Sequence, residues 1–305
     1  MNKKSMSWWP LAPGQVAQVQ VYDLATGKST TIYEDPESVV EAPNWAADGQ
    51  SLVINRDGDL FTVPASGGGR TQIDTAGQLG DANNDHVLAP DGKHLYVSEN
   101  DGHIYRVALA GGEVAKMTDA ADGLSARYLH GVSPDGRNLV FIGGPVTATL
   151  APYNIYVLEM ASGELTQLTH AEKRHDGAEY SPDGEWIYFN SERNSIIPGH
   201  CQIFRMRPDG SGVEQLTSDA RVNWFPHPSP DGQKLVYLSY PPLTDGHPSN
   251  LPIQLFVTDP LCQQTTAVID LFGGQGTINT PSWHPDSTKF AYVAYPVLHP
   301  PFVGQ

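Results

Sequence analysis

The chain has 305 residues, of which 39% are hydrophobic, and this is enough to build a buried core. Its formal net charge of −16 argues against nucleic acid or an anionic membrane surface as a partner. No apolar run approaches the roughly 18 residues of a membrane-spanning helix, so we expect no transmembrane segment.

The first 14 residues place Lys3 and Lys4 ahead of Trp8 but lack the hydrophobic segment of a secretory signal. Two cysteines, Cys201 and Cys262, are too few for a disulfide framework. These features predict a cytoplasmic protein with free thiols. A periplasmic location is the alternative if a leader segment has been removed.

The first strand-like segments, residues 16–23 and 29–33, flank an Ala-Thr-Gly-Lys turn. A second kind of turn, related to Ser-Pro-Asp-Gly, then recurs six times, at residues 46–49, 89–92, 133–136, 181–184, 229–232 and 284–287. Its aspartates, at positions 48, 91, 135, 183, 231 and 286, are 43 to 55 residues apart. Repeats of this length that contain several strands are typical of a β-propeller.

The fourth repeat shows how one blade is built. Residues 177–180 predict a first strand, and the turn that follows has a proline that presets φ and a glycine that accepts positive φ. Residues 186–189 are aromatic and β-branched, as in a second strand. Residues 202–207 alternate apolar and polar side chains, and residues 213–217 follow another turn. The repeat therefore predicts four antiparallel strands.

We predict an all-β, six-bladed propeller that forms a single domain over residues 1–305. The expected blades are 41–75, 83–118, 127–169, 175–218, 223–270 and 279–295. The last repeat ends after two strands, and residues 16–34 can supply the missing two. The N-terminal strands should therefore pair with the C-terminal blade and close the ring, which removes free sheet edges.

Three segments carry a resemblance to a known family: His-Asp-Gly-Ala-Glu-Tyr-Ser-Pro-Asp-Gly (175–184), Asn-Trp-Phe-Pro-His-Pro-Ser-Pro-Asp-Gly (223–232) and Gly-Gly-Gln-Gly-Thr-Ile-Asn (273–279). They resemble a TolB-like subgroup of propellers, with WD40-like (PD40) repeats, made of the propeller alone. This resemblance implies a binding or scaffold protein. The layout is also similar, more distantly, to oligogalacturonate lyases, which hold a divalent metal with histidines near the propeller axis.

The connections between the second and third strands differ in length from blade to blade. Those of blades 1 and 2 are short (55–58 and 99–102), whereas those of blades 3, 4 and 5 are long (143–153, 191–201 and 240–252). Long loops in a compact repeat tend to be functional. All of them should lie on the face opposite the Ser-Pro-Asp-Gly turns, so we expect the site on that face.

Polar side chains gather where the inner strands of successive blades begin, beneath these loops. The candidate ligand-binding residues there are His86, His130, His175, Asp176, Glu179, Asn223, His227 and Asn279. Asp85 and Gln275 are close to them in the sequence, and the long loops add Arg193 and His247. Which of these side chains face the channel depends on strand register, because a shift of one residue reverses the facing.

The sequence leaves three interpretations of the histidines open. They can hydrogen-bond neighbouring strands and channel water, with no ligand. Alternatively, His130, His175 and His227 can converge on one divalent metal ion in the axial channel, since imidazoles suit Zn, Mn, Fe or Ni. The third interpretation is a metal-free site for a sugar or another small molecule.

Two functions follow from these interpretations. The first is a binding or scaffold protein, expected to be monomeric, whose partner is a small polar ligand such as a carbohydrate, or a protein. The alternative is a metal-dependent carbohydrate-active enzyme, of the polysaccharide lyase or glycoside hydrolase type, that uses the same site. The sequence assigns no catalytic residue.

Overall fold

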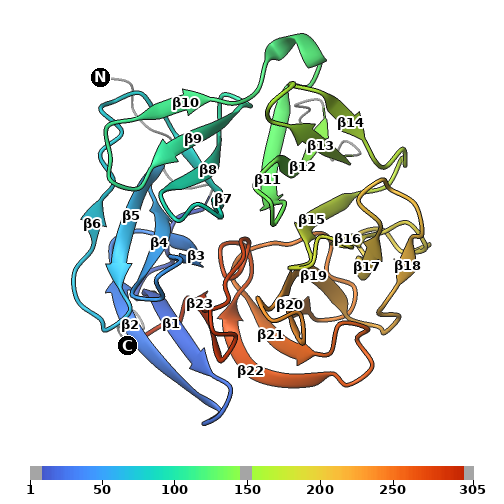
Figure 1. The fold of residues 1–305 in the computed structure, drawn as a ribbon. Helices are drawn as coiled ribbons and strands as arrows, with labels where there is room; N and C mark the ends of the chain where they lie inside the picture. Colours follow the sequence, from blue (N-terminus) through green and yellow to red (C-terminus); the bar gives the residue numbers. More distant parts are fainter. Residues whose placement is uncertain (1–8, 145–152, 299–305) are drawn as a thin grey trace.

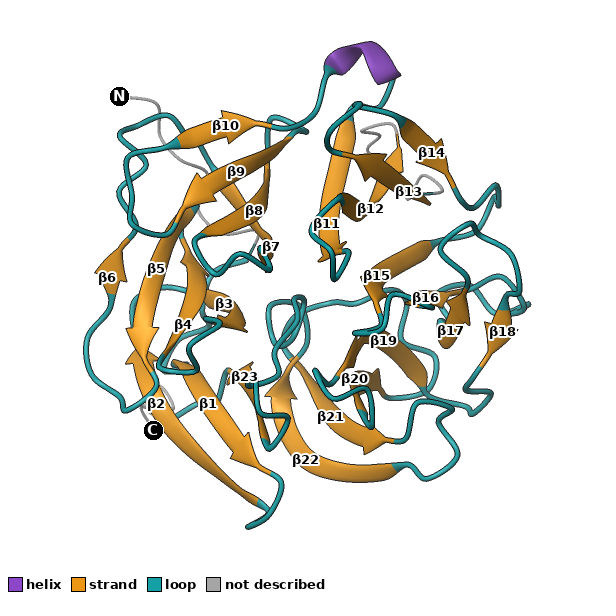
Figure 2. Ribbon diagram, viewed as in Figure 1, coloured by secondary structure: helices purple, strands orange, loops and turns teal. Residues whose placement is uncertain are grey.

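The computed structural model describes residues 9–144 and 153–298. Their strands form six antiparallel sheets arranged as blades around a central axis (Figure 1; Figure 2). The helical content of these residues is the short 3-10 turn η1 (Ala120–Asp122), and no helix among them is long and apolar enough to cross a membrane. The predicted six-bladed propeller is therefore confirmed.

Five of the sheets have four strands in sequence order, as predicted. Blade 1 contains β3 (Val40–Trp45), β4 (Ser51–Arg56), β5 (Asp59–Pro64) and β6 (Thr71–Gln72). Blade 2 contains β7 (Ala82–Leu88), β8 (His94–Glu99), β9 (Ile104–Ala108) and β10 (Val114–Lys116). Blade 3 contains β11 (Ala126–Val132), β12 (Asn138–Gly144), β13 (Asn154–Glu159) and β14 (Leu165–Gln167).

The next two blades repeat the same order. Blade 4 contains β15 (His175–Tyr180), β16 (Ile187–Ser191), β17 (Gln202–Met206) and β18 (Glu214–Gln215). Blade 5 contains β19 (Val222–Pro228), β20 (Leu235–Tyr240), β21 (Leu251–Thr258) and β22 (Thr266–Gly273). Of the predicted blade-3 loop 143–153, residues 145–152 lie outside the described residues.

The sixth blade closes the ring with both ends of the chain. β1 (Ala17–Asp23) pairs with β23 (Lys289–Ala294) on one side and with β2 (Lys28–Asp35) on the other. The predicted closure is therefore confirmed. The inner position of this blade is less regular than predicted, because a bridge from Trp283 to Phe290 and isolated backbone hydrogen bonds replace a continuous strand. Pro281 lies in this segment and has no N–H to donate to a ladder.

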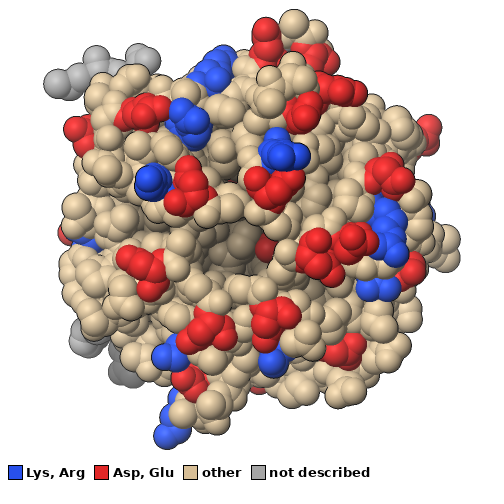
Figure 3. Space-filling model, in the orientation of Figure 1, with Lys and Arg blue, Asp and Glu red and all other residues tan. Residues whose placement is uncertain are grey.

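The Ser-Pro-Asp-Gly turns stabilise themselves. In blade 4, the Ser181 hydroxyl donates to Asp183 at 2.5 Å and accepts the backbone N–H of Trp186 at 2.9 Å. Blades 3 and 5 repeat this arrangement around Ser133 and Ser229. A turn whose polar groups are paired within itself serves the fold. Figure 3 shows a hollow at the centre of the ring, with acidic side chains distributed around it.

Gly102 sets the distance between blades 2 and 3. Its φ is +89°, and a Cβ at this position would lie 2.2 Å from the backbone oxygen of Ser125. Both the left-handed backbone and the overlap with main chain oppose a side chain. We expect Gly102→Ala to lower the free energy of unfolding by more than about 2 kcal/mol. Denaturant unfolding measures this.

Gly112 provides the matched control for that substitution. Its φ is +84°, but a Cβ there would meet no atom within 4 Å. Gly112→Ala should therefore show only the backbone cost, about 1 kcal/mol. Equal losses in the two variants would contradict the role assigned to the contact between Gly102 and Ser125.

Candidate functional site

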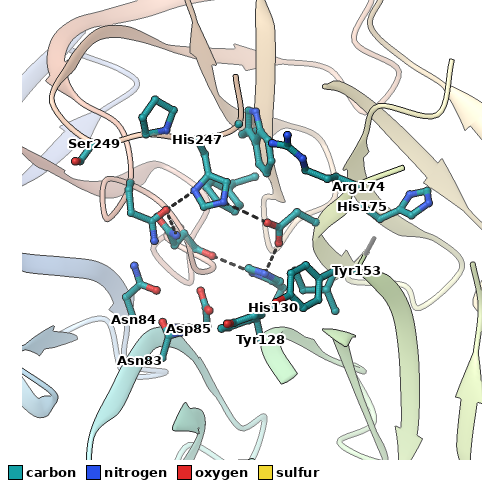
Figure 4. Close-up of a pocket in the computed structure, with 18 of the residues that line it drawn as sticks. Asn83, Asn84, Asp85, Tyr128, His130, Tyr153, Arg174, His175, His247 and Ser249 are labelled. Atoms are coloured by element: carbon teal, nitrogen blue, oxygen red, sulfur yellow. Dashed lines mark hydrogen bonds and ion pairs between the residues drawn. The ribbon is translucent and has the colours of Figure 1, made fainter. Parts of the chain in front are cut away.

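A cavity of about 550 Å³ lies where the inner strands of blades 2 to 5 converge. Its polar lining comes from β7, β11, β15 and the blade-6 segment that holds Gln275 and Asn279, and the blade-5 loop closes one side with residues 245–249 (Figure 4). The side chains that line it are Trp9, Asn83, Asn84, Asp85, Tyr128, His130, Ile142, Tyr153, Arg174, His175, Asp176, Trp224, Phe225, Asp245, His247, Pro248, Ser249, Gln275 and Asn279. Side chains from five blades thus meet in one space.

A buried ion pair between His130 and Asp176 forms the polar centre of the cavity. His130 Nε2 lies 2.7 Å from Asp176 Oδ1, and His130 Nδ1 lies 3.3 Å from the backbone oxygen of Asn279. Burial opposes a charge on His130, but the Asp176 carboxylate outweighs it and raises the pKa of His130 to about 9. Burial also acts to raise the pKa of Asp176, and His130 holds it below its usual value. The two side chains are therefore charged at neutral pH.

His247 joins this pair to the blade-6 segment. Its Nε2 lies 3.6 Å from Asp176 Oδ2, and its Nδ1 lies 2.5 Å from Gln275 Oε1 (Figure 4). The same Gln275 oxygen accepts a hydrogen bond from Asn279 Nδ2 at 3.2 Å. Burial lowers the pKa of His247, so its imidazole is neutral at pH 7. These contacts fix the ring of a loop histidine in one orientation.

Asp85 differs from the other acidic groups of the site. The residue is 5% exposed, and its carboxylate faces the cavity in Figure 4. Within residues 9–144 and 153–298, its carboxyl oxygens have no hydrogen-bond partner. Burial raises the pKa of Asp85 to about 7; the nearby charge on His130 opposes this shift and that on Asp176 adds to it. A buried carboxyl with unused acceptors is costly unless something binds it.

Aromatic rings form the less polar wall. The rings of Tyr128 and Tyr153 meet edge to face at 5.6 Å, and those of Trp224 and Phe225 lie 4.5 and 5.4 Å from the His247 ring. Phe225 has a φ of +52°, which is rare for a residue with a large side chain. It lies in a β-bulge between Trp224 and His227 that interrupts the pairing of β19 with β20. The bulge is what places Trp224 and Phe225 together on the cavity.

The predicted site residues fall into two groups. Five line the cavity: His130, His175, Asp176, His247 and Asn279. The His175 ring points away from the centre in Figure 4 and lies 5.9 Å from the ring of Phe189. Burial lowers its pKa to about 4, so this ring is neutral.

The other five predicted residues do not line the cavity, and most have structural partners: His86, Glu179, Arg193, Asn223 and His227. His227 Nδ1 lies 2.6 Å from Glu179 Oε2, and its Nε2 lies 2.5 Å from the Ile278 carbonyl oxygen. Asn223 accepts from Ser239 at 2.6 Å, and the Arg193 guanidinium lies over the ring of Phe204.

The residues that sequence reasoning missed come from two sources. Asn83, Asn84 and Tyr128 lie on the inner strands, where a bulge in each of blades 1 to 5 shifts the facing of the side chains. Tyr153 ends the predicted long loop 143–153, whose length was a signal, whereas Arg174 immediately precedes β15, where the repeat gives none. Neither set could be found from the spacing of the turns alone.

The predicted metal site lacks support in the part of the chain that the structure describes. There, no group of three His, Cys, Asp or Glu side chains is arranged to hold a metal ion. His130 and His227 are each bound to a different carboxylate, and only the first lines the cavity. Convergence of His130, His175 and His227 on one ion therefore stays a prediction.

Comparisons with known proteins agree on one family. A family described as the TolB β-propeller domain matches residues 131–242. An uncharacterized protein of Agrobacterium fabrum is 38% identical over 279 residues, which is 92% of each chain. A structure from Agrobacterium tumefaciens, solved under the provisional name TolB, has a TM-score of 0.83 at 38% identity and covers 92% of this chain and 98% of its own. TolB from Acinetobacter baumannii has a TM-score of 0.61 at 18% identity, with 86% and 65% covered, and so shares the fold.

Proposed function

Because the chain belongs to the TolB-like β-propeller family, whose fold supports a binding or scaffold role, we propose that it is a binding protein that holds a small polar molecule in the cavity around His130, Asp176 and His247. The observation that carries the proposal is the cavity itself. Its volume of about 550 Å³ lies within the range of small-molecule sites. Its few polar groups lie beside aromatic rings, a combination that is typical of such sites.

The polar groups are held in place before any ligand arrives. Asp176 is fixed by His130, and His247 is fixed by Gln275 and by the rings of Trp224 and Phe225. A ligand that binds such groups loses little free energy to reorganising the protein. The arrangement therefore favours recognition of a rigid small molecule over a flat contact with a large one.

The metal-dependent carbohydrate enzyme is less well supported by the same cavity. No three-ligand group for a metal is present among residues 9–144 and 153–298. A uronic acid substrate would also bring its carboxylate close to Asp85 and Asp176, and like charges repel in a buried site. We therefore propose binding as the function.

A defined panel tests the proposal: neutral hexoses, hexuronic acids, amino acids and small amines, screened by saturation-transfer NMR and then by calorimetry. We expect at least one class to bind the native protein. His247→Ala should weaken that binding by tenfold or more, because the ring contacts Asp176, Gln275 and the aromatic wall.

His94→Ala is the matched control for this variant. His94 also pairs with an aspartate, Asp91, at 2.6 Å, but it does not line the cavity. The affinity of the His94→Ala variant for the same ligand should equal that of the native protein. If no panel member binds, or if both variants bind as the native protein does, the proposed function is wrong.

A further inference from the structure

Several carboxyl groups are buried on the inner strands. Among the residues that the structure describes, Asp85 is the member of this set whose carboxyl group has neither a hydrogen-bonded cation nor another hydrogen-bond donor. Asp176 has His130 at 2.7 Å, Glu179 has His227 at 2.6 Å, and Glu41 accepts from Asn84 at 3.1 Å. Asp85 is as deeply buried as Glu41, at 5% exposure, and its oxygens open to the cavity. Its acceptors are available to a ligand.

The basic groups at the cavity are already engaged. His130 is paired with Asp176, and Arg174 is shared between Glu192 at 3.1 Å and Asp245 at 2.8 Å. The remaining histidines of the lining, His175 and His247, are neutral at pH 7 because burial lowers the pKa of each. Once Asp85 is ionised, the cavity has an excess of negative charge. In a partly dry site this attracts a cation and repels an anion.

The surroundings of Asp85 suit a cation that carries carbon. Burial raises the pKa of the Tyr128 phenol, and the charges of Tyr153 and Asp85 add to this shift. Tyr128 and Asp85 face the same space in Figure 4. Trp224 and Phe225 form the wall of the same cavity. Aromatic faces attract ammonium groups and pack against the skeleton that bears them.

We propose that the ligand of this cavity is a small organic molecule with a protonated amine, whose N–H groups donate to the carboxylate of Asp85 while its skeleton packs on the aromatic wall. This inference rests on the proposed function, because it assigns the ligand class of that same cavity. The ammonium supplies the hydrogen-bond donors that the described residues do not provide to the Asp85 carboxyl, and its positive charge adds to that of nearby His130.

Matched pairs of probes isolate the ammonium group. Tyramine and tyrosol differ in a terminal ammonium against a hydroxyl, and cyclohexylmethylamine and cyclohexylmethanol repeat this difference on an aliphatic skeleton. Calorimetry at pH 8, where Asp85 is ionised, should show the amine of each pair binding at least tenfold tighter, about 1.4 kcal/mol. Asp85→Asn keeps the size of the side chain and should reduce the preference to less than about twofold.

Asp270→Asn is the control, since Asp270 lies on the outer strand β22 and bonds Gln254 at 2.7 Å. It should retain the full preference for amines, and melting curves confirm that both variants are folded. Equal binding of amine and alcohol, or a preference that survives in Asp85→Asn, overturns the amine assignment and leaves the proposed function standing. Absence of binding by all four probes also overturns the amine assignment. The proposed function is tested separately, by the wider panel of sugars, amino acids and amines.

Discussion

Replacing Asp176 with alanine is expected to lower the free energy of unfolding at pH 6 by about 3–5 kcal/mol, because it leaves the His130 imidazolium buried without its partner. The loss should depend on pH. The pKa of His130 is raised from 6.5 to about 9, so its contribution is complete below pH 6.5 and is lost as the pH rises through 9. The pKa of Asp176 is lowered, so its contribution disappears as the pH falls below the usual value of 3.8. The difference between variant and native protein should therefore be largest between pH 4 and 6.5.

Urea unfolding of both proteins across this pH range measures the effect, and His94→Ala supplies the control. Asp91 and His94 form a pair of the same type at 2.6 Å, but on the surface, and removing His94 leaves the backbone hydrogen bonds of Asp91 intact. Exposed pairs contribute about 1 kcal/mol or less. Similar losses for Asp176→Ala and His94→Ala would show that the buried pair does not hold the cavity together.

Replacing Asp85 with asparagine should have the opposite effect on stability. Burial raises the pKa of Asp85 from 3.8 to about 7, so the folded protein keeps this proton where the unfolded chain has lost it. The free energy of unfolding of the native protein therefore falls as the pH rises from about 4 to 7. At pH 8 the full cost of holding the ionised Asp85 carboxylate in a buried site is present. Asp85→Asn removes this cost and should raise the free energy of unfolding at pH 8 by about 2–4 kcal/mol. At pH 4 the two proteins should be nearly equal.

Unfolding at pH 4 and pH 8 tests this second expectation. Glu41→Gln is an informative companion, because burial also raises the pKa of Glu41 to about 7 although Glu41 accepts a hydrogen bond from Asn84. Each substitution should remove its own part of the fall in the free energy of unfolding between pH 4 and 7. An Asp85→Asn protein that is less stable than the native protein at pH 8 would contradict the view that the ionised Asp85 carboxylate lacks a stabilising hydrogen-bond partner.

The architecture was predictable because the Ser-Pro-Asp-Gly turns repeat and pair within themselves, as at Ser181 and Asp183. Ring closure was predictable because the last repeat lacks two strands and the N-terminus supplies them, and β1 does pair with β23. The irregular inner segment of blade 6 was not predicted, although Pro281 is a local signal that a continuous strand is unfavourable there.

The composition of the site was only partly predictable. The inner strands carry the polar residues, and His130, Asp176 and His247 do meet. Strand alternation cannot say which neighbours join them, because bulges interrupt it. One of these bulges holds Phe225 at a positive φ and turns it to the cavity, while His227 bonds Glu179 instead. Sequence alone thus locates the region, and backbone geometry selects the residues.

The most direct test of the binding cavity is a crystal structure of the native protein grown with tyramine. We expect a ligand inside the cavity, with its ammonium nitrogen within hydrogen-bond distance of an Asp85 carboxyl oxygen and its ring against Tyr128, Trp224 or Phe225. A cavity that holds only water at a concentration of tyramine that saturates binding in solution, or a ligand bound elsewhere on the propeller, would contradict it.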